Sequence, residues 1–187
     1  MTPPLPLRAD ATHAHNENSD PQPDRLDGAQ ESCFADCLIA ADVARGVGRL
    51  FHRHGLTQLC EVPLPNGRRA DLMAFDARGD IVIVEIKVSR ADLLGDMKWP
   101  DYLDFCDRFF WALPSGFDHS PLEGEAYLPN RSGIIIADKY DAEILRPAAT
   151  HRLAPARRKA ETLRLARLAM QRAMVAQDAE LRALPFG

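Results

Sequence analysis

The run Ile81–Val88, which reads IVIVEIKV, constrains the fold of this chain more than any other feature. Six of its eight residues are β-branched aliphatics, as expected for a strand that is covered on both faces. Glu85 and Lys87 interrupt it, and the two-residue period of a strand puts their side chains on the same face. Charged groups inside such a strand are costly unless they are paired or bind a metal. The sequence therefore predicts a central strand that carries chemistry.

Two interpretations of Glu85 and Lys87 are open. In the first, the two residues form an ion pair with each other at the exposed C-terminal end of the strand. In the second, they belong to a catalytic group. The spacing alone does not decide, because Asp96 and Lys98 repeat it and are expected to be an incidental match.

Asp71 favours the catalytic interpretation. It lies in a second apolar run, Arg69–Phe75, which a turn joins to the strand of Glu85 as a plausible hairpin. Two carboxylates that lie close together repel each other unless a cation lies between them. Oxygen ligands suit Mg²⁺, which keeps waters and uses few protein carboxylates, and a neighbouring lysine can serve the attacking water.

The rest of the chain predicts an α/β domain in which helices flank a sheet. Its composition, with 46% hydrophobic and 27% charged residues in 187, fits one globular domain. The predicted elements are a helix over Ser32–Gly55 that is broken near Gly46 and Gly48, strands over Thr57–Val62, Arg69–Phe75, Ile81–Val88, Phe109–Leu113 and Ile134–Ala137, a helix over Ala91–Cys106 kinked at Pro100, and a long C-terminal helix over Pro155–Leu184.

Several classes of protein are disfavoured. The segment Met1–Gln30 is rich in Pro, Asp, Asn and His and predicts a disordered tail, with the domain over residues 31–187. The N-terminus lacks the apolar core of a signal peptide and no apolar run is long enough for a membrane span, so a cytoplasmic location is expected. The four cysteines have neither the spacing of a zinc ribbon nor that of a disulfide framework.

Charge is distributed unevenly along the chain. Residues 1–44 hold two arginines against eight acidic residues, whereas residues 146–187 hold eight arginines and one lysine against three acidic residues. The C-terminal helix is therefore predicted to contact the phosphates of an anionic partner through Arg157, Arg158 and Arg164. The alternative is a solvated face whose arginines cover apolar surface with their stems.

The sequence has an acidic residue on one strand of a predicted hairpin and an acid-x-Lys motif on the next strand. This arrangement resembles the active site of the PD-(D/E)xK nuclease superfamily, with Asp71, Glu85 and Lys87 at the three positions. Longer stretches resemble the MmcB family of DNA repair proteins over roughly residues 35–175. These stretches are GRRADL from Gly67, VEIKVS from Val84, KWPDYLDFCD from Lys98 and RLAPARRKA from Arg152.

The resemblance implies a restriction-endonuclease-like mixed sheet flanked by helices, a DNA substrate and Mg²⁺ or Mn²⁺ as cofactor. Asp71 and Glu85 would hold the metal, the Ile86 carbonyl would complete the site, and Lys87 would act on the water. Ala70 stands where the superfamily name has Pro. The resemblance suggests further candidates. Glu61 is the first choice for an additional acid and Asp42 the second, and Lys98 and Tyr102 on the next helix could also contribute. Ser89 and Arg90 could contact the phosphate, although Ser89 equally fits a helix cap.

The expected function is a Mg²⁺-dependent DNA nuclease that acts in repair on damaged or structured DNA. The main alternative is a DNA-binding repair accessory protein that keeps the nuclease fold without turnover. A small-molecule enzyme is disfavoured because no Gly-rich phosphate loop or nucleophile elbow is present. A homodimer and a repair-protein partner both remain open.

Overall fold

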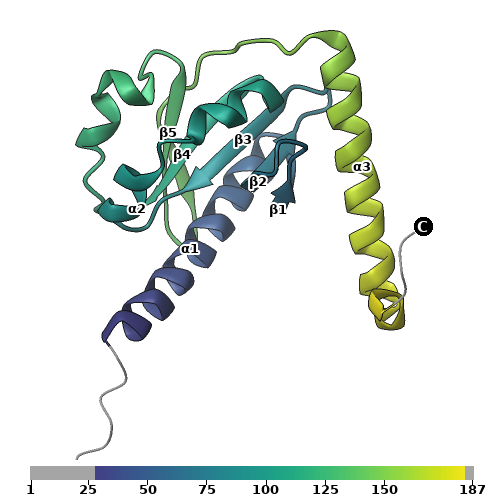
Figure 1. Ribbon diagram of the computed structural model, residues 1–187, viewed down its shortest axis with the longest axis horizontal. Helices are drawn as coiled ribbons and strands as arrows, with labels where there is room; N and C mark the ends of the chain where they lie inside the picture. Colours follow the sequence, from purple (N-terminus) through teal and green to yellow (C-terminus); the bar gives the residue numbers. More distant parts are fainter. Residues whose placement is uncertain (1–27, 184–187) are drawn as a thin grey trace, which may run out of the picture.

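A computed structural model describes residues 28–183 and contains a mixed six-stranded sheet flanked by helices, as predicted (Figure 1). The predicted tail lies almost entirely outside the described residues. The elements are α1 (Gly28–Arg53), β1 (Thr57–Pro63), β2 (Arg69–Phe75), β3 (Ile81–Ile86), α2 (Arg90–Gly95), the 3-10 turn η1 (Trp99–Phe105), β4 (Arg108–Pro114), η2 (Ser120–Glu123), η3 (Glu125–Tyr127), β5 (Ser132–Ala137), β6 (Ala142–Arg146), α3 (Pro155–Gln177) and η4 (Ala179–Ala183).

The strands lie in the sheet in the same order as in the sequence. β1, β2 and β3 form an antiparallel meander, β3, β4 and β5 are parallel, and β6 closes the far edge antiparallel to β5. The strand of Glu85 is therefore central, with β2 on one side and β4 on the other. The first five residues of β3 are all buried, which explains the nearly continuous run of β-branched side chains.

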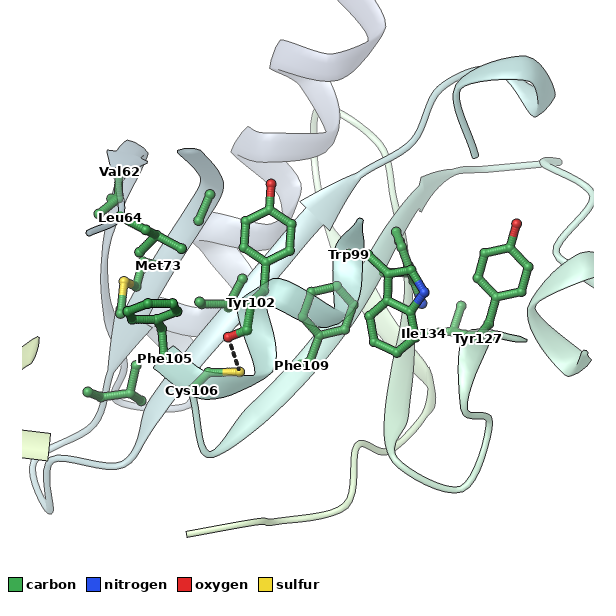
Figure 2. Close-up of a cluster of buried hydrophobic side chains, with 14 of the residues drawn as sticks. Val62, Leu64, Met73, Trp99, Tyr102, Phe105, Cys106, Phe109, Tyr127 and Ile134 are labelled. Carbon is green, nitrogen blue, oxygen red and sulfur yellow. Dashed lines mark hydrogen bonds between the residues drawn. The ribbon is translucent and has the colours of Figure 1, made fainter. Parts of the chain in front are cut away.

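Each face of the sheet has its own apolar core. α1 covers one face and packs on β-strand residues such as Leu72, Val84 and Phe110. The other face is covered by the turns around η1 and by Leu165 of α3. Figure 2 shows this second core, in which aromatic side chains such as Trp99 and Phe109 lie together, with ring centroids 5.1 Å apart.

Three predicted boundaries were wrong. α1 is continuous, and Gly46 serves packing instead of a break, because a Cβ there would lie 2.2 Å from the carbonyl oxygen of Asp138. The helix predicted over Ala91–Cys106 is divided into α2 and η1, and Pro100 lies in the first turn of η1, where its missing N–H is tolerated. α3 ends at Gln177, before the predicted Leu184.

One strand, β6, was not predicted. It is an edge strand in which only Ala142 is buried, so its pattern lacks the apolar run that marked the other strands. The other edge, β1, lies beside α3 (Figure 1). Arg172 donates hydrogen bonds to the carbonyl oxygens of Cys60 and Glu61. α3 therefore caps carbonyl groups of an edge strand that would otherwise invite pairing with another chain.

Within residues 28–183, no helix combines the length and the apolar character needed to cross a membrane.

Candidate active site

The site begins where β2 and β3 separate. Their ladder ends at the pair Leu72 and Val84, and the next residues on the two strands are Asp71 and Glu85. Beyond this pair, backbone N–H groups donate to side-chain carboxylates instead of to carbonyl groups of the neighbouring strand. The Ile86 N–H donates to Asp71 Oδ2 at 2.7 Å, and the Asp71 N–H donates to Glu85 Oε1 at 3.2 Å. Each carboxylate thus binds the backbone of the opposite strand, and the hairpin brings the two acids together.

The surroundings of these carboxylates oppose ionisation. Glu85 is only 3% exposed, and its burial together with the charge of Asp71 raises its pKa to about 9. Burial also raises the pKa of Asp71, against the opposing effects of the Ile86 N–H and the Lys87 charge. Without a cation, the pair therefore holds a proton at neutral pH, and a divalent cation would replace it.

Lys87 directly follows β3, which ends at Ile86 and not at the predicted Val88, and it pairs with acids other than Glu85. Its Nζ is 2.8 Å from Asp96 Oδ2 and 3.5 Å from Asp92 Oδ1, and its side chain is 8% exposed. Burial by itself would lower the pKa of Lys87, but Asp96, Asp92 and Glu85 together raise it. The ion pair between Glu85 and Lys87 that the sequence left open is not among the ion pairs of the described residues.

Asp96 is the residue that sequence analysis misjudged. Its spacing predicts an incidental partner of Lys98, yet Asp96 follows α2 as its C-terminal cap and holds the ammonium group of Lys87. No local pattern reveals this contact, because it depends on the way α2 folds back over the end of β3. Lys98 itself is exposed and precedes η1, and its side chain has no hydrogen bond or ion pair to residues 39–182.

The other residues predicted near the site have mixed outcomes. Tyr102 is buried in the core of Figure 2 and donates its hydroxyl to the Arg69 carbonyl oxygen at 3.1 Å. Burial and then the charge of Glu85 raise its pKa, which places it close to the acidic pair. Ser89 caps α2 by accepting from the Asp92 N–H, and the exposed Arg90 pairs with Asp118.

A cleft of about 570 Å³ opens beside Asp71, between α1 and β1. Glu61 lines it but pairs with Arg69 at 2.6 Å, and its backbone has a φ of 52°, in the left-handed region that non-glycine residues rarely adopt. Ile86 lines it too, and strand geometry directs the Ile86 carbonyl to the same side as its N–H, toward β2. Asp42, on α1, is not among the lining residues.

The donor set fits Mg²⁺ better than a transition metal. Among residues 28–183 there is no group of three or more His, Cys, Asp or Glu side chains arranged to hold a metal ion. Asp71 and Glu85 supply two carboxylates, each with one oxygen that accepts a hydrogen bond from a backbone N–H. Mg²⁺ in phosphoryl-transfer sites is bound by one or two carboxylates, with waters and substrate phosphates completing the shell.

Two of the three α3 arginines that were predicted to contact phosphates make hydrogen bonds and ion pairs within the protein. Arg158 makes two hydrogen bonds to Asp107, at 2.6 and 2.7 Å, and Asp107 has a fully buried side chain. Arg164 pairs with the buried Glu161 and donates to the Pro63 carbonyl oxygen. Both arginines therefore have structural contacts within the protein, and their role at DNA phosphates stays a prediction. Arg157 remains exposed, with its guanidinium 5.1 Å from the centroid of the Phe105 ring.

Comparison with known proteins identifies one similar solved structure and one family model. A solved structure described as "SPO1766 protein of unknown function from Silicibacter pomeroyi" is similar to this chain, with 43% identity and a TM-score of 0.67 over 75% of this chain and 92% of that one. No curated protein matches. A family model described as "DNA repair protein MmcB-like" matches residues 30–180. The chain therefore belongs to the MmcB-like family of DNA repair proteins.

Proposed function

We propose that this protein is a Mg²⁺-dependent DNA phosphodiesterase of the PD-(D/E)xK type that acts in repair. The observation that carries the proposal is the reciprocal hydrogen bonding of Asp71 and Glu85 across the separated ends of β2 and β3. It places two carboxylates side by side on one edge, with a charged lysine on the same face. A buried acid beside a half-buried one, which repel each other when both are ionised, is more typical of a functional site than of a structural one.

Asp71 and Glu85 would hold the ion, and the Ile86 carbonyl faces the same side. The ion, once bound, would polarise a phosphodiester oxygen and balance the charge that develops on it. Mn²⁺, which takes the same oxygen ligands, would serve as well.

Lys87 would contribute positive charge and a proton donor beside the reacting phosphate. An ammonium group has three N–H donors, of which Asp96 and Asp92 engage two, so one remains for a water or a phosphate oxygen. The raised pKa of Lys87 keeps it protonated at neutral pH. Asp96 fixes the direction of the Lys87 side chain and is a positioning residue in this scheme.

A second candidate function is a DNA-binding repair accessory without turnover. The pairing of Lys87 with Asp96 favours it, since the ammonium charge is largely balanced within the protein. The MmcB-like family supports a repair role under either proposal.

Cleavage assays separate the two. The purified chain would be incubated with Mg²⁺, Mn²⁺ or EDTA on labelled single-stranded, duplex, nicked, flapped and crosslinked DNA. The nuclease proposal predicts cleavage of at least one substrate with metal, loss of cleavage in EDTA and in Asp71→Asn, and retention in Asp104→Asn, which changes an exposed carboxylate on η1. DNA binding without cleavage under all these conditions would favour the accessory.

A further inference from the structure

The cleft beside Asp71 has a floor and rim that the proposed chemistry does not use. α1 lines it with the small side chains of Ala40, Ala41 and Ala44, and β1 lines it with Gln58 and Cys60. Its volume of about 570 Å³ lies within the roughly 300–1,000 Å³ that is typical of ligand sites. Because Asp71 forms part of its wall, whatever occupies the cleft lies against the proposed metal ligands.

Arg45 is the basic residue of this cleft. It projects from α1, it is exposed, and its side chain has no ion pair or hydrogen bond to the side chains or backbone of residues 39–182. The other charged groups that line the cleft are Glu61 and Asp71, and Glu61 is already paired with Arg69. An anion in the cleft would therefore meet Arg45 on one side and, with the ion bound, a cation beside Asp71 on the other.

We infer that this cleft takes one unpaired nucleotide of a DNA strand, with its phosphate on Arg45. The inference rests on the proposed function and names its substrate class. The cleft is bounded by a helix on one side and an edge strand on the other, so a strand must bend between them to bring a phosphate to Asp71. A single strand, a flap or a frayed end can bend in this way, whereas a base held in a duplex must first be unpaired and unstacked, at a cost of a few kcal/mol.

The small side chains of α1 support the choice of a nucleotide. They leave an apolar wall on which a base and its sugar can lie, while Arg45 is placed to bind the phosphate through charge-assisted hydrogen bonds. Gln58 adds a side-chain amide, whose oxygen is buried without a hydrogen-bond partner in the described structure. The site contains no set of donors that would distinguish one base from another, so binding is independent of sequence.

The test uses fluorescence anisotropy with the full chain in Mg²⁺, a labelled oligothymidine strand and a duplex of equal length. Ala41→Trp would fill the cleft from an exposed helix position, and Arg45→Ala would remove the phosphate contact. Ala173→Trp on α3 and Arg78→Ala at the turn between β2 and β3 are matched controls, since both residues are exposed and neither lines the cleft.

The wild type should bind the single strand more tightly than the duplex. Both cleft variants should weaken single-strand binding by about tenfold, as loss of a charge-assisted contact implies, while the controls change it less than twofold. A duplex preference, absence of strand binding, or wild-type affinity in both cleft variants would overturn the inference. Gels run on the same samples distinguish failure of this inference from failure of the proposed nuclease function. If DNA is cleaved but the cleft variants bind the single strand as the wild type does, the nuclease proposal stands and the cleft inference fails. If the cleft variants bind the single strand more weakly but no DNA is cleaved, the cleft inference stands and the nuclease proposal fails.

Discussion

The ammonium group of Lys87 lies 2.8 Å from the carboxylate of Asp96, at the C-terminal cap of α2. This contact links the central strand to the element that follows it and sets the direction of the lysine side chain. It also helps the buried lysine to stay charged, since burial alone would lower the pKa of Lys87.

The first prediction concerns this contact. Asp96→Asn should leave the protein folded but reduce metal-dependent cleavage, because the lysine loses both its orientation and the charge that keeps it protonated. The alkaline limb of the pH–rate profile should move to lower pH, which a merely structural role for Asp96 would not produce. Asp104→Asn, an exposed aspartate of η1, is the control and should keep the wild-type profile. A normal rate and profile in Asp96→Asn would show that Lys87 needs no positioning.

The second prediction is that metal binding releases a proton from the acidic pair. The pKa of Glu85 is raised to about 9, so at pH 7 its proton must leave before the carboxylate can bind a cation. Calorimetric titration of Mg²⁺ or Mn²⁺ in two buffers with different ionisation enthalpies should show up to one proton released per ion. Affinity should rise with pH until about 9. An enthalpy that does not depend on the buffer would contradict the protonated pair.

The third prediction concerns stability without metal. A carboxyl whose pKa is raised on folding stabilises the protein fully below its unfolded pKa, and this contribution is lost as pH rises through the folded pKa. For Glu85 this loss of stability extends from about pH 4.5, the ordinary pKa, to about pH 9, the pKa in the folded protein. Thermal melts in EDTA should therefore give a falling Tm across this range, and Glu85→Gln should flatten the fall. A Tm in the wild type that rises toward pH 9 would contradict this assignment.

The fourth prediction separates two neighbouring arginines of α3. Burial would raise the pKa of Asp107, but Arg158 and the N–H groups of Ile81 and Leu153 hold it below its ordinary value. Arg158→Ala leaves this buried carboxylate without its cation and should lower the free energy of unfolding by about 3–5 kcal/mol. Arg157→Ala loses only a contact with an aromatic ring and should cost about 1 kcal/mol or less.

Arg157 is consequently the cleaner probe of DNA contact by this helix. If its guanidinium binds a phosphate, Arg157→Glu should weaken binding to all DNA sequences alike and reduce the salt dependence by about one counterion. Denaturant melts of both single variants, run beside DNA titrations, check the two predictions together. Equal stability loss in Arg157→Ala and Arg158→Ala would contradict the assignment of Arg158 to the interior.

The sequence predicted the strands of the site well, because β2 and β3 are buried runs whose apolar pattern is local. It also predicted that Asp71 and Glu85 meet, since a short hairpin leaves few other registers. It missed the role of Asp96, the interior pairing of Arg158 and the carbonyl cap formed by Arg172. Each of these contacts joins elements that are distant in the chain or depends on how a short helix folds back, so tertiary packing decides them and residue spacing does not.

The central claim is that Asp71 and Glu85 hold one divalent ion jointly. The most direct measurement is a titration of Mn²⁺ into the wild type and Asp71→Asn, each with single-stranded DNA present, followed by electron paramagnetic resonance of the free ion. The wild type should bind one ion, and Asp71→Asn should bind it with an affinity at least about tenfold lower while its fold stays intact. Equal Mn²⁺ affinity in the two proteins, or no binding in the wild type, would contradict it.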